Sequence, residues 1–118
     1  MQIEQHRLLH QTLHSLIVRP LNSSELESIA NTIALFHNKG VYHADLNINN
    51  ILFNEDGDVY IIDFDRGELK VPNPQWQQNN MARLKRSFSK EQGRNSVFNW
   101  QSNDWATLNV LYSQKLSA

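Results

Sequence analysis

The spacing of apolar residues changes at Gly40, and no other feature of the sequence constrains the fold as strongly. Before Gly40, apolar side chains recur at helical spacing, at Leu26, Ile29, Ile33 and Phe36. Ser24 and Glu27 match the capping-box pattern that opens a helix, and Gly40 is a typical stop. After Gly40 the apolar runs are short and β-prone, at 41–43, 51–53 and 59–62. A capped helix followed by short strands predicts an α+β fold.

Two of these runs are predicted to pair. A turn at 55–58 separates 51–53 from 59–62, and Gly57 can take the positive φ that such a turn requires, so we expect an antiparallel hairpin. Helices are predicted at 3–17, at 76–91 and, capped by Asp104, at 104–115, with loops at 63–74 and 93–101. No linker divides the sequence, so we expect residues 1–118 to form a single domain of helices around one small hairpin.

Composition excludes several classes of protein. The sequence has no cysteine, so disulfides and thiol chemistry are excluded, and no apolar run is long enough to span a membrane. We expect no secretory signal in the first 20 residues, because charged residues and histidines interrupt the apolar stretch that such a signal needs. The net charge of -1 hides an asymmetry, since 45–68 holds seven acids and one base, whereas 70–94 holds six bases and one acid. This predicts a cation site beside an anion site, or simply two solvated faces, and nucleic-acid binding is not expected.

The residues that carry chemistry lie at 43–50 and 62–65. Phosphoryl transfer needs a carboxylate that accepts the proton of the attacking hydroxyl, and oxygen ligands that hold Mg²⁺ against the phosphates. Four residues separate Asp45 from Asn50, the spacing of the protein-kinase catalytic loop, and Asp63 ends the second strand of the hairpin. The hairpin would bring Asn50 and Asp63 together at its open end. We therefore predict Asp45 as the base, Asn50 and Asp63 as Mg²⁺ ligands, and His43 as a brace for the loop; the alternative is ordinary turn carboxylates.

Two positions distinguish this sequence from protein kinases: Asn47 replaces a usual Lys, and Asp65 replaces the Gly of the Asp-Phe-Gly motif. From about residue 16 onward the sequence resembles the 3-deoxy-D-manno-octulosonic acid (Kdo) kinases of the lipopolysaccharide kinase family. The segments that carry the resemblance are 19–21, 36–37, 40–47, 50–52, 62–67, Trp76 and 80–88.

This resemblance implies a protein-kinase-like fold, with a catalytic loop at 43–50 and a metal loop at 63–67. Kinases of this type transfer the γ-phosphate of ATP to a hydroxyl of the Kdo sugar on a lipid A precursor, at the inner face of the inner membrane. ATP and Mg²⁺ are then the expected cofactors, and peripheral membrane contact is expected. The basic helix would bind anions of the acceptor through Arg83, Lys85, Arg86 and Lys90. A solvated basic face is the alternative.

The groups with which kinases hold ATP are not found in the sequence. None of the four glycines belongs to a G-x-G-x-x-G cluster, and no Lys precedes Lys39. We therefore expect a C-terminal lobe without its N-terminal ATP lobe, poorly active unless that lobe or a partner chain is supplied. The alternatives are another small-molecule kinase, a RIO-type protein kinase, or a non-catalytic binding module. The run 65–67 and the Arg-rich helix favour a Kdo acceptor.

Overall fold

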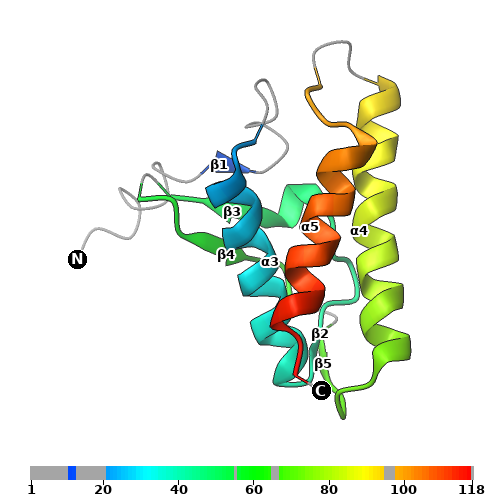
Figure 1. Cartoon of the computed structure of the whole chain (residues 1–118). Coiled ribbons are helices and arrows are strands. Elements are labelled where there is room, and N and C mark those ends of the chain that lie inside the picture. The colour runs from blue at the N-terminus through cyan, green and yellow to red at the C-terminus, as the bar shows by residue number, and fades with distance from the viewer. Residues whose placement is uncertain (1–10, 13–20, 55, 65–66, 95–97, 118) are drawn as a thin grey trace, which may run out of the picture.

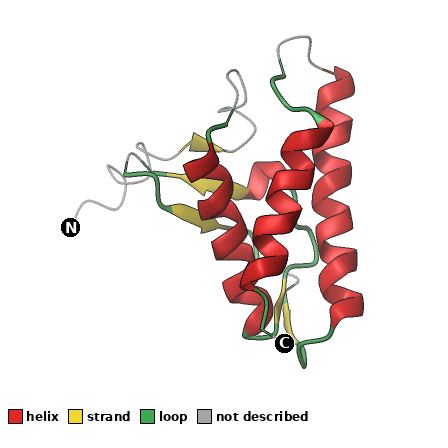
Figure 2. Ribbon diagram, viewed as in Figure 1, coloured by secondary structure: helices red, strands yellow, loops and turns green. Residues whose placement is uncertain are grey.

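The protein has an α+β architecture, as its sequence predicts. The computed structural model describes residues 11–117 apart from 13–20, 55, 65–66 and 95–97. The described helices are α3 (Ser23–Asn38), η1 (Ile48–Asn50), α4 (Pro74–Arg94) and α5 (Ser102–Lys115), and the strands are β1 (Gln11–Thr12), β2 (Val41–Tyr42), β3 (Ile51–Phe53), β4 (Val59–Ile61) and β5 (Glu68–Leu69). Figure 1 shows α3, α4 and α5 side by side, and Figure 2 shows the strands β1, β3 and β4 beside them on the left.

The N-cap of helix α3 lies two residues before the predicted one. Asn22 is the N-cap, and its side chain and backbone exchange hydrogen bonds with Glu25 at 2.8 and 2.9 Å. Leu21 and Leu26, which flank this cap at the positions of a hydrophobic staple, are both buried. The Ser24–Glu27 prediction is therefore wrong, because core burial of Leu21 and Leu26 selects the earlier of two possible boxes.

Gly40 ends α3 and also accommodates another part of the chain. Its φ is +78°, and its carbonyl oxygen accepts a hydrogen bond of 2.7 Å from the backbone of Lys70. A β-carbon at this position would lie 2.1 Å from the Lys70 carbonyl oxygen. Glycine is thus required both for the turn and for the close approach of the segment after β5.

The predicted hairpin is present, with additional strands. β3 and β4 pair antiparallel with Ile51 opposite Ile61, and Gly57 has a φ of +85° in the turn between them. β1 pairs with the other edge of β3, so the predicted helix at 3–17 is wrong at Gln11–Thr12, where the backbone pairs with β3. The apolar residues that predicted this helix lie outside the described residues. β5 lies inside the predicted loop 63–74 and pairs with β2. Because β5 has only two residues, its sequence shows no strand periodicity.

The two C-terminal helices start earlier than their patterns predict. α4 starts at Pro74 and not at 76, because Pro needs no partner for a backbone N–H and the Asn73 side chain accepts from the N–H of Gln75. Asp104 is not the cap of α5: it lies in the first turn, where its carboxylate accepts from the N–H of Gln101 at 2.9 Å. None of the helices in the described residues has both the length and the apolar character that a membrane span requires.

The core lies between the three long helices and the predicted catalytic loop, 43–50, whose Leu46 and Ile48 are buried. Leu84 and Phe88 of α4 are fully buried with Ile29 of α3 and Leu108 of α5. Trp100 stacks on Phe88 with ring centroids 3.7 Å apart. The remaining tryptophans also pack within the protein: Trp76 contacts the rings of His37 and Tyr42, and Trp105 packs against the core.

Candidate active site

His43 connects the predicted catalytic loop, 43–50, to Ile62, the residue that follows β4 and precedes Asp63. The N–H of Asp45 donates to Nδ1 of His43 at 3.0 Å, so Nδ1 is the acceptor nitrogen and Nε2 carries the hydrogen. Nε2 then donates to the carbonyl oxygen of Ile62 at 2.7 Å. The ring also packs against Phe64, with centroids 4.5 Å apart. Both ring nitrogens are occupied by backbone groups, which supports a bracing role for His43.

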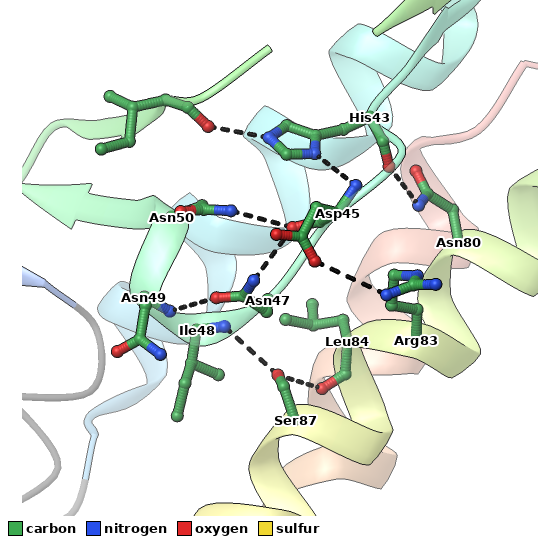
Figure 3. Close-up of polar contacts among 11 residues, drawn as sticks. His43, Asp45, Asn47, Ile48, Asn49, Asn50, Asn80, Arg83, Leu84 and Ser87 are labelled. Carbon is green, nitrogen blue, oxygen red and sulfur yellow. Dashed lines mark hydrogen bonds and ion pairs between the residues drawn. The ribbon is translucent and has the colours of Figure 1, made fainter. Parts of the chain in front are cut away.

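The backbone of Asp45 is held on its other side by two amide side chains. Asn47 and Asn50 both donate from Nδ2 to the carbonyl oxygen of Asp45, at 3.1 and 2.9 Å (Figure 3). Asn47 also accepts from the N–H of Asn49, which caps the short helix η1. These backbone contacts fix the position of Asp45 while its side chain stays exposed.

Alternating burial anchors the loop to the core. Leu46, Ile48 and Asn50 are buried, whereas Asp45 and Asn49 are exposed. The N–H of Ile48 donates to the hydroxyl of Ser87 on α4, at 3.2 Å. The loop is therefore attached both to the core and to α4, and Asp45 faces solvent.

Asn50 immediately precedes β3 and Asp63 follows β4, so both residues lie at the same end of the hairpin. The N–H of Ile62 donates to the backbone oxygen of Asn50 at 2.9 Å, so Asn50 is aligned with the residue just before Asp63. Because Nδ2 of Asn50 is bonded to the loop, its oxygen Oδ1 occupies the other arm of the planar amide. Asp63 is exposed and has a φ of +70°. The topology thus brings the two predicted metal ligands to one end of the hairpin.

A buried chain of hydrogen bonds extends from α5 to the catalytic loop, and sequence reasoning did not predict it. Nδ1 of His37 contacts the Tyr112 hydroxyl at 2.5 Å, and Nε2 of His37 contacts Oδ1 of Asn80 at 3.0 Å. Asn80 in turn donates to the backbone oxygen of His43 at 2.8 Å. Because Asn80 donates through Nδ2, its Oδ1 accepts from His37, so Nε2 of His37 carries a hydrogen.

The sequence does contain a signal for this chain. His37 continues the apolar stripe of Ile29 and Ile33 at intervals of four, and Asn80 begins the stripe that continues at Leu84 and Phe88. A polar residue on an apolar helical stripe must find a buried partner. Both residues are buried, and each finds its partner on another element.

Folding stability is expected to decrease in mild acid because of His37. Burial lowers the pKa of His37 below its usual 6.5, and the hydrogen bond that His37 donates to Asn80 only partly opposes this. The unfolded chain then binds more protons below about pH 7, so stability falls as pH decreases through this range, by at most about 1.4 kcal/mol per pH unit for one group. Urea unfolding at about pH 7.5 and 5.5 measures the loss. His37→Gln should reduce it, and an equal loss in both proteins would contradict the assignment.

A groove of about 260 Å³ separates the catalytic loop from α4. Nη1 of Arg83 lies 3.5 Å from Oδ1 of Asp45 across it (Figure 3). Arg86 and Lys90 also line the groove, as does one further acid, Glu91. Lys85 does not line this groove, because it follows Arg83 by two residues and a helix turns about 200° over that interval. Lys85 lines a second groove, between α4 and α5. The structure thus brings three of the four predicted anion-binding residues to Asp45.

Comparison with protein families tests the resemblance to lipopolysaccharide kinases that the sequence suggested. The model of the family described as "Lipopolysaccharide kinase (Kdo/WaaP) family" matches residues 5–112. The chain belongs to the lipopolysaccharide kinase (Kdo/WaaP) family. The predicted resemblance is therefore confirmed.

The chain has curated relatives that are named 3-deoxy-D-manno-octulosonic acid kinase. The relative from Xylella fastidiosa (strain M23) is 47% identical over 78 residues, which cover 64% of this chain and 31% of the relative. That from Stenotrophomonas maltophilia (strain K279a) is 44% identical over 86 residues, covering 73% and 34%. That from Xanthomonas campestris pv. campestris (strain B100) is 49% identical over 67 residues, covering 57% and 27%. The matched part spans about a third of the relatives' length.

Kinase chemistry in the lipopolysaccharide kinase family implies magnesium, and the residues present fit this ion. Across the described ranges, no three His, Asp or Glu side chains are grouped so that they could hold a metal by themselves. Magnesium needs fewer protein ligands, because water and substrate phosphates complete its coordination. The amide oxygen of Asn50 and the carboxylate of Asp63 are hard oxygen donors at one end of the hairpin, and Asp63 is exposed to solvent.

Proposed function

We propose that this chain is the catalytic part of a Kdo kinase with a protein-kinase-like C-terminal lobe. In this proposal ATP phosphorylates a hydroxyl of the Kdo sugar on a lipid A precursor. One observation carries it: a carboxylate on a rigidly held loop, Asp45, faces a groove whose opposite wall is a basic helix. Family membership and the names of the relatives support the substrate class.

Asp45 is the proposed base of the reaction. The acceptor hydroxyl gives its proton to the Asp45 carboxylate while its oxygen bonds to the γ-phosphorus of ATP. The bond from the γ-phosphorus to the bridging oxygen breaks, and ADP leaves with the electron pair. Magnesium held by Asn50 and Asp63 would neutralise the phosphate charge. His43, Asn47 and the Asn50 amide fix the loop, so the base needs no reorganisation during the reaction.

Arg83, Arg86 and Lys90 are the proposed acceptor-binding residues. The acceptor offers the carboxylate of the sugar acid and the phosphates of the lipid precursor, and cationic side chains bind both. The same helix would favour peripheral attachment to the anionic cytoplasmic face of the inner membrane, at about 1 kcal/mol for each basic residue near the surface. Lys85 lies outside this groove and is not part of the proposal.

Additional groups must clamp the phosphates of ATP. The four glycines of the sequence form no phosphate-binding cluster, and the matched part covers 31% of the Xylella fastidiosa relative. We propose that a nucleotide-binding lobe, in the same protein or in a partner chain, supplies them. Each such group typically contributes about 10²–10³ in rate, so the 118-residue chain by itself should turn over very slowly.

The test is ATP-dependent transfer to a Kdo-lipid A precursor. The 118-residue chain is compared with a version extended upstream by a nucleotide-binding lobe, each beside its Asp45→Ala variant. Transfer by the extended version, lost in its Asp45→Ala form, is the expected result. If neither version transfers phosphate, the acceptor or the catalytic role is wrong, and a binding module without chemistry becomes the better account. Ordinary turnover by the short chain would contradict the need for a second lobe.

A further inference from the structure

Arg83 can reach two different partners from one position on α4. Its guanidinium contacts the Asp45 carboxylate, and the same side chain lines the groove beside Arg86 and Lys90. The groove contains three cations and two acids, Asp45 and Glu91. An anion entering it would therefore compete with Asp45 for Arg83.

The contact between Arg83 and Asp45 is suited to exchange. The N···O distance of 3.5 Å exceeds the roughly 2.7–2.9 Å of a strong charge-assisted hydrogen bond. The two side chains are 47% and 57% exposed, so water screens the pair. In contrast, the backbone N–H and carbonyl of Asp45 are bonded to His43, Asn47 and Asn50, so exchange at the side chain would leave the loop in place.

We propose that Arg83 changes partner when the acceptor binds. In the free protein it pairs with Asp45; in the complex it pairs with an anionic group of the acceptor and releases Oδ1 of Asp45 to receive the hydroxyl proton. The inference rests on the proposed function and deepens it. Arg83 is then a specificity residue as well as an anion ligand, because the base is released only when an anion is present.

The exchange restricts which acceptors can react. The anion must lie within one arginine side chain of the hydroxyl that attacks, since Arg83 reaches Asp45 and the groove from one backbone position. A sugar acid with its carboxylate near the accepting hydroxyl meets this condition, and so does a sugar phosphorylated next to it. A neutral sugar of the same shape leaves Arg83 on Asp45 and should react poorly.

Anion binding to the 118-residue chain, measured without ATP, is the direct test. The probes are free 3-deoxy-D-manno-octulosonic acid as its salt, inorganic phosphate, and the neutral methyl ester of the sugar acid. Binding is followed by NMR shifts of the backbone amides at 45–49 and of the Arg83 side chain.

The acid should bind and the ester should not. Arg83→Gln should weaken binding of the acid about tenfold, as expected for one charge-assisted hydrogen bond. Lys85→Gln, a change of the same charge on the same helix outside the groove, should have little effect. If inorganic phosphate binds and the sugar acid does not, the anion that Arg83 recognises is a phosphate of the acceptor and not its carboxylate.

A mutant cycle with Asp45→Asn separates exchange from simple charge repulsion. Removing the carboxylate frees Arg83, so the acid should bind about two- to fivefold tighter to Asp45→Asn than to the unchanged protein. In the Arg83→Gln background the same substitution should give no gain, because there is no arginine to release. An equal gain in both backgrounds would show that Asp45 merely repels the anion, and the exchange would be rejected. So would the absence of any anion-dependent shift up to concentrations on the order of tens of millimolar.

Failure of the inference and failure of the proposed function give different results. Coupled anion binding without phosphoryl transfer by the extended protein would leave the exchange standing and reject the kinase activity. Transfer that requires Asp45, together with no coupling between Asp45 and Arg83 in the cycle, would keep the kinase and reject the exchange.

Discussion

Asp45→Asn should lower kcat for phosphoryl transfer by about 10²–10⁴-fold in the extended, transfer-competent protein, the usual contribution of a general base. Asparagine has the shape of aspartate but cannot accept the hydroxyl proton. The bonds that hold this residue involve its backbone N–H and carbonyl oxygen, so the loop should keep its position. The loss should therefore fall on the chemical step.

Single-turnover rates with ATP and the Kdo-lipid precursor measure this loss, and the midpoint of thermal unfolding serves as the control for folding. Asp58→Asn, an acid in the hairpin turn at the other end of β4, should leave the rate unchanged. A rate for Asp45→Asn within about threefold of the unchanged protein would exclude Asp45 as the base, since a general base contributes far more.

Asp63→Asn should lower transfer by about 10²–10³-fold, the typical effect of removing one group that stabilises charge in the transition state. The backbone of Asp63 has a φ of +70°, a region that asparagine tolerates well and that alanine does not. Asparagine at this position therefore separates the loss of the metal-binding carboxylate from backbone strain.

The dependence of the rate on Mg²⁺ concentration distinguishes a metal ligand from a structural residue. Loss of one of two protein ligands should raise the Mg²⁺ concentration needed for half-maximal rate, and additional Mg²⁺ should recover part of the activity. An Asp63→Asn protein with a lower rate but an unchanged Mg²⁺ dependence would place the ligand elsewhere.

Local patterns predicted the parts of this protein that depend on neighbours in the sequence. The apolar stripe of α3 and its stop at Gly40, the turn at Gly57 and the β3–β4 hairpin follow from residues within about a dozen positions of one another. The spacing from Asp45 to Asn50, on which the predicted catalytic loop rests, is also a local pattern. These features need little from the rest of the chain, because helical and hairpin hydrogen bonds are made between close residues.

Boundaries and short strands were predicted less well, because distant residues decide them. Asn22 caps α3 in place of Ser24, with the buried Leu21 and Leu26 on either side of that cap. β5 has only two residues, and its structure comes from pairing with β2. A two-residue strand has no periodicity to read, so only its partner reveals it.

The candidate site divides in the same way. The sequence predicts a base and two metal ligands from residue type, order and spacing, at Asp45, Asn50 and Asp63. The tertiary structure alone decided which basic residues face Asp45, because the packing of α4 turns Arg83, Arg86 and Lys90 toward the loop and Lys85 away from it. It also decided the buried partners of His37 and Asn80, which lie 43 positions apart and meet only when α3 and α4 pack together. Side-chain direction and long-range polar pairing depend on the relative placement of helices, and no local pattern encodes that placement.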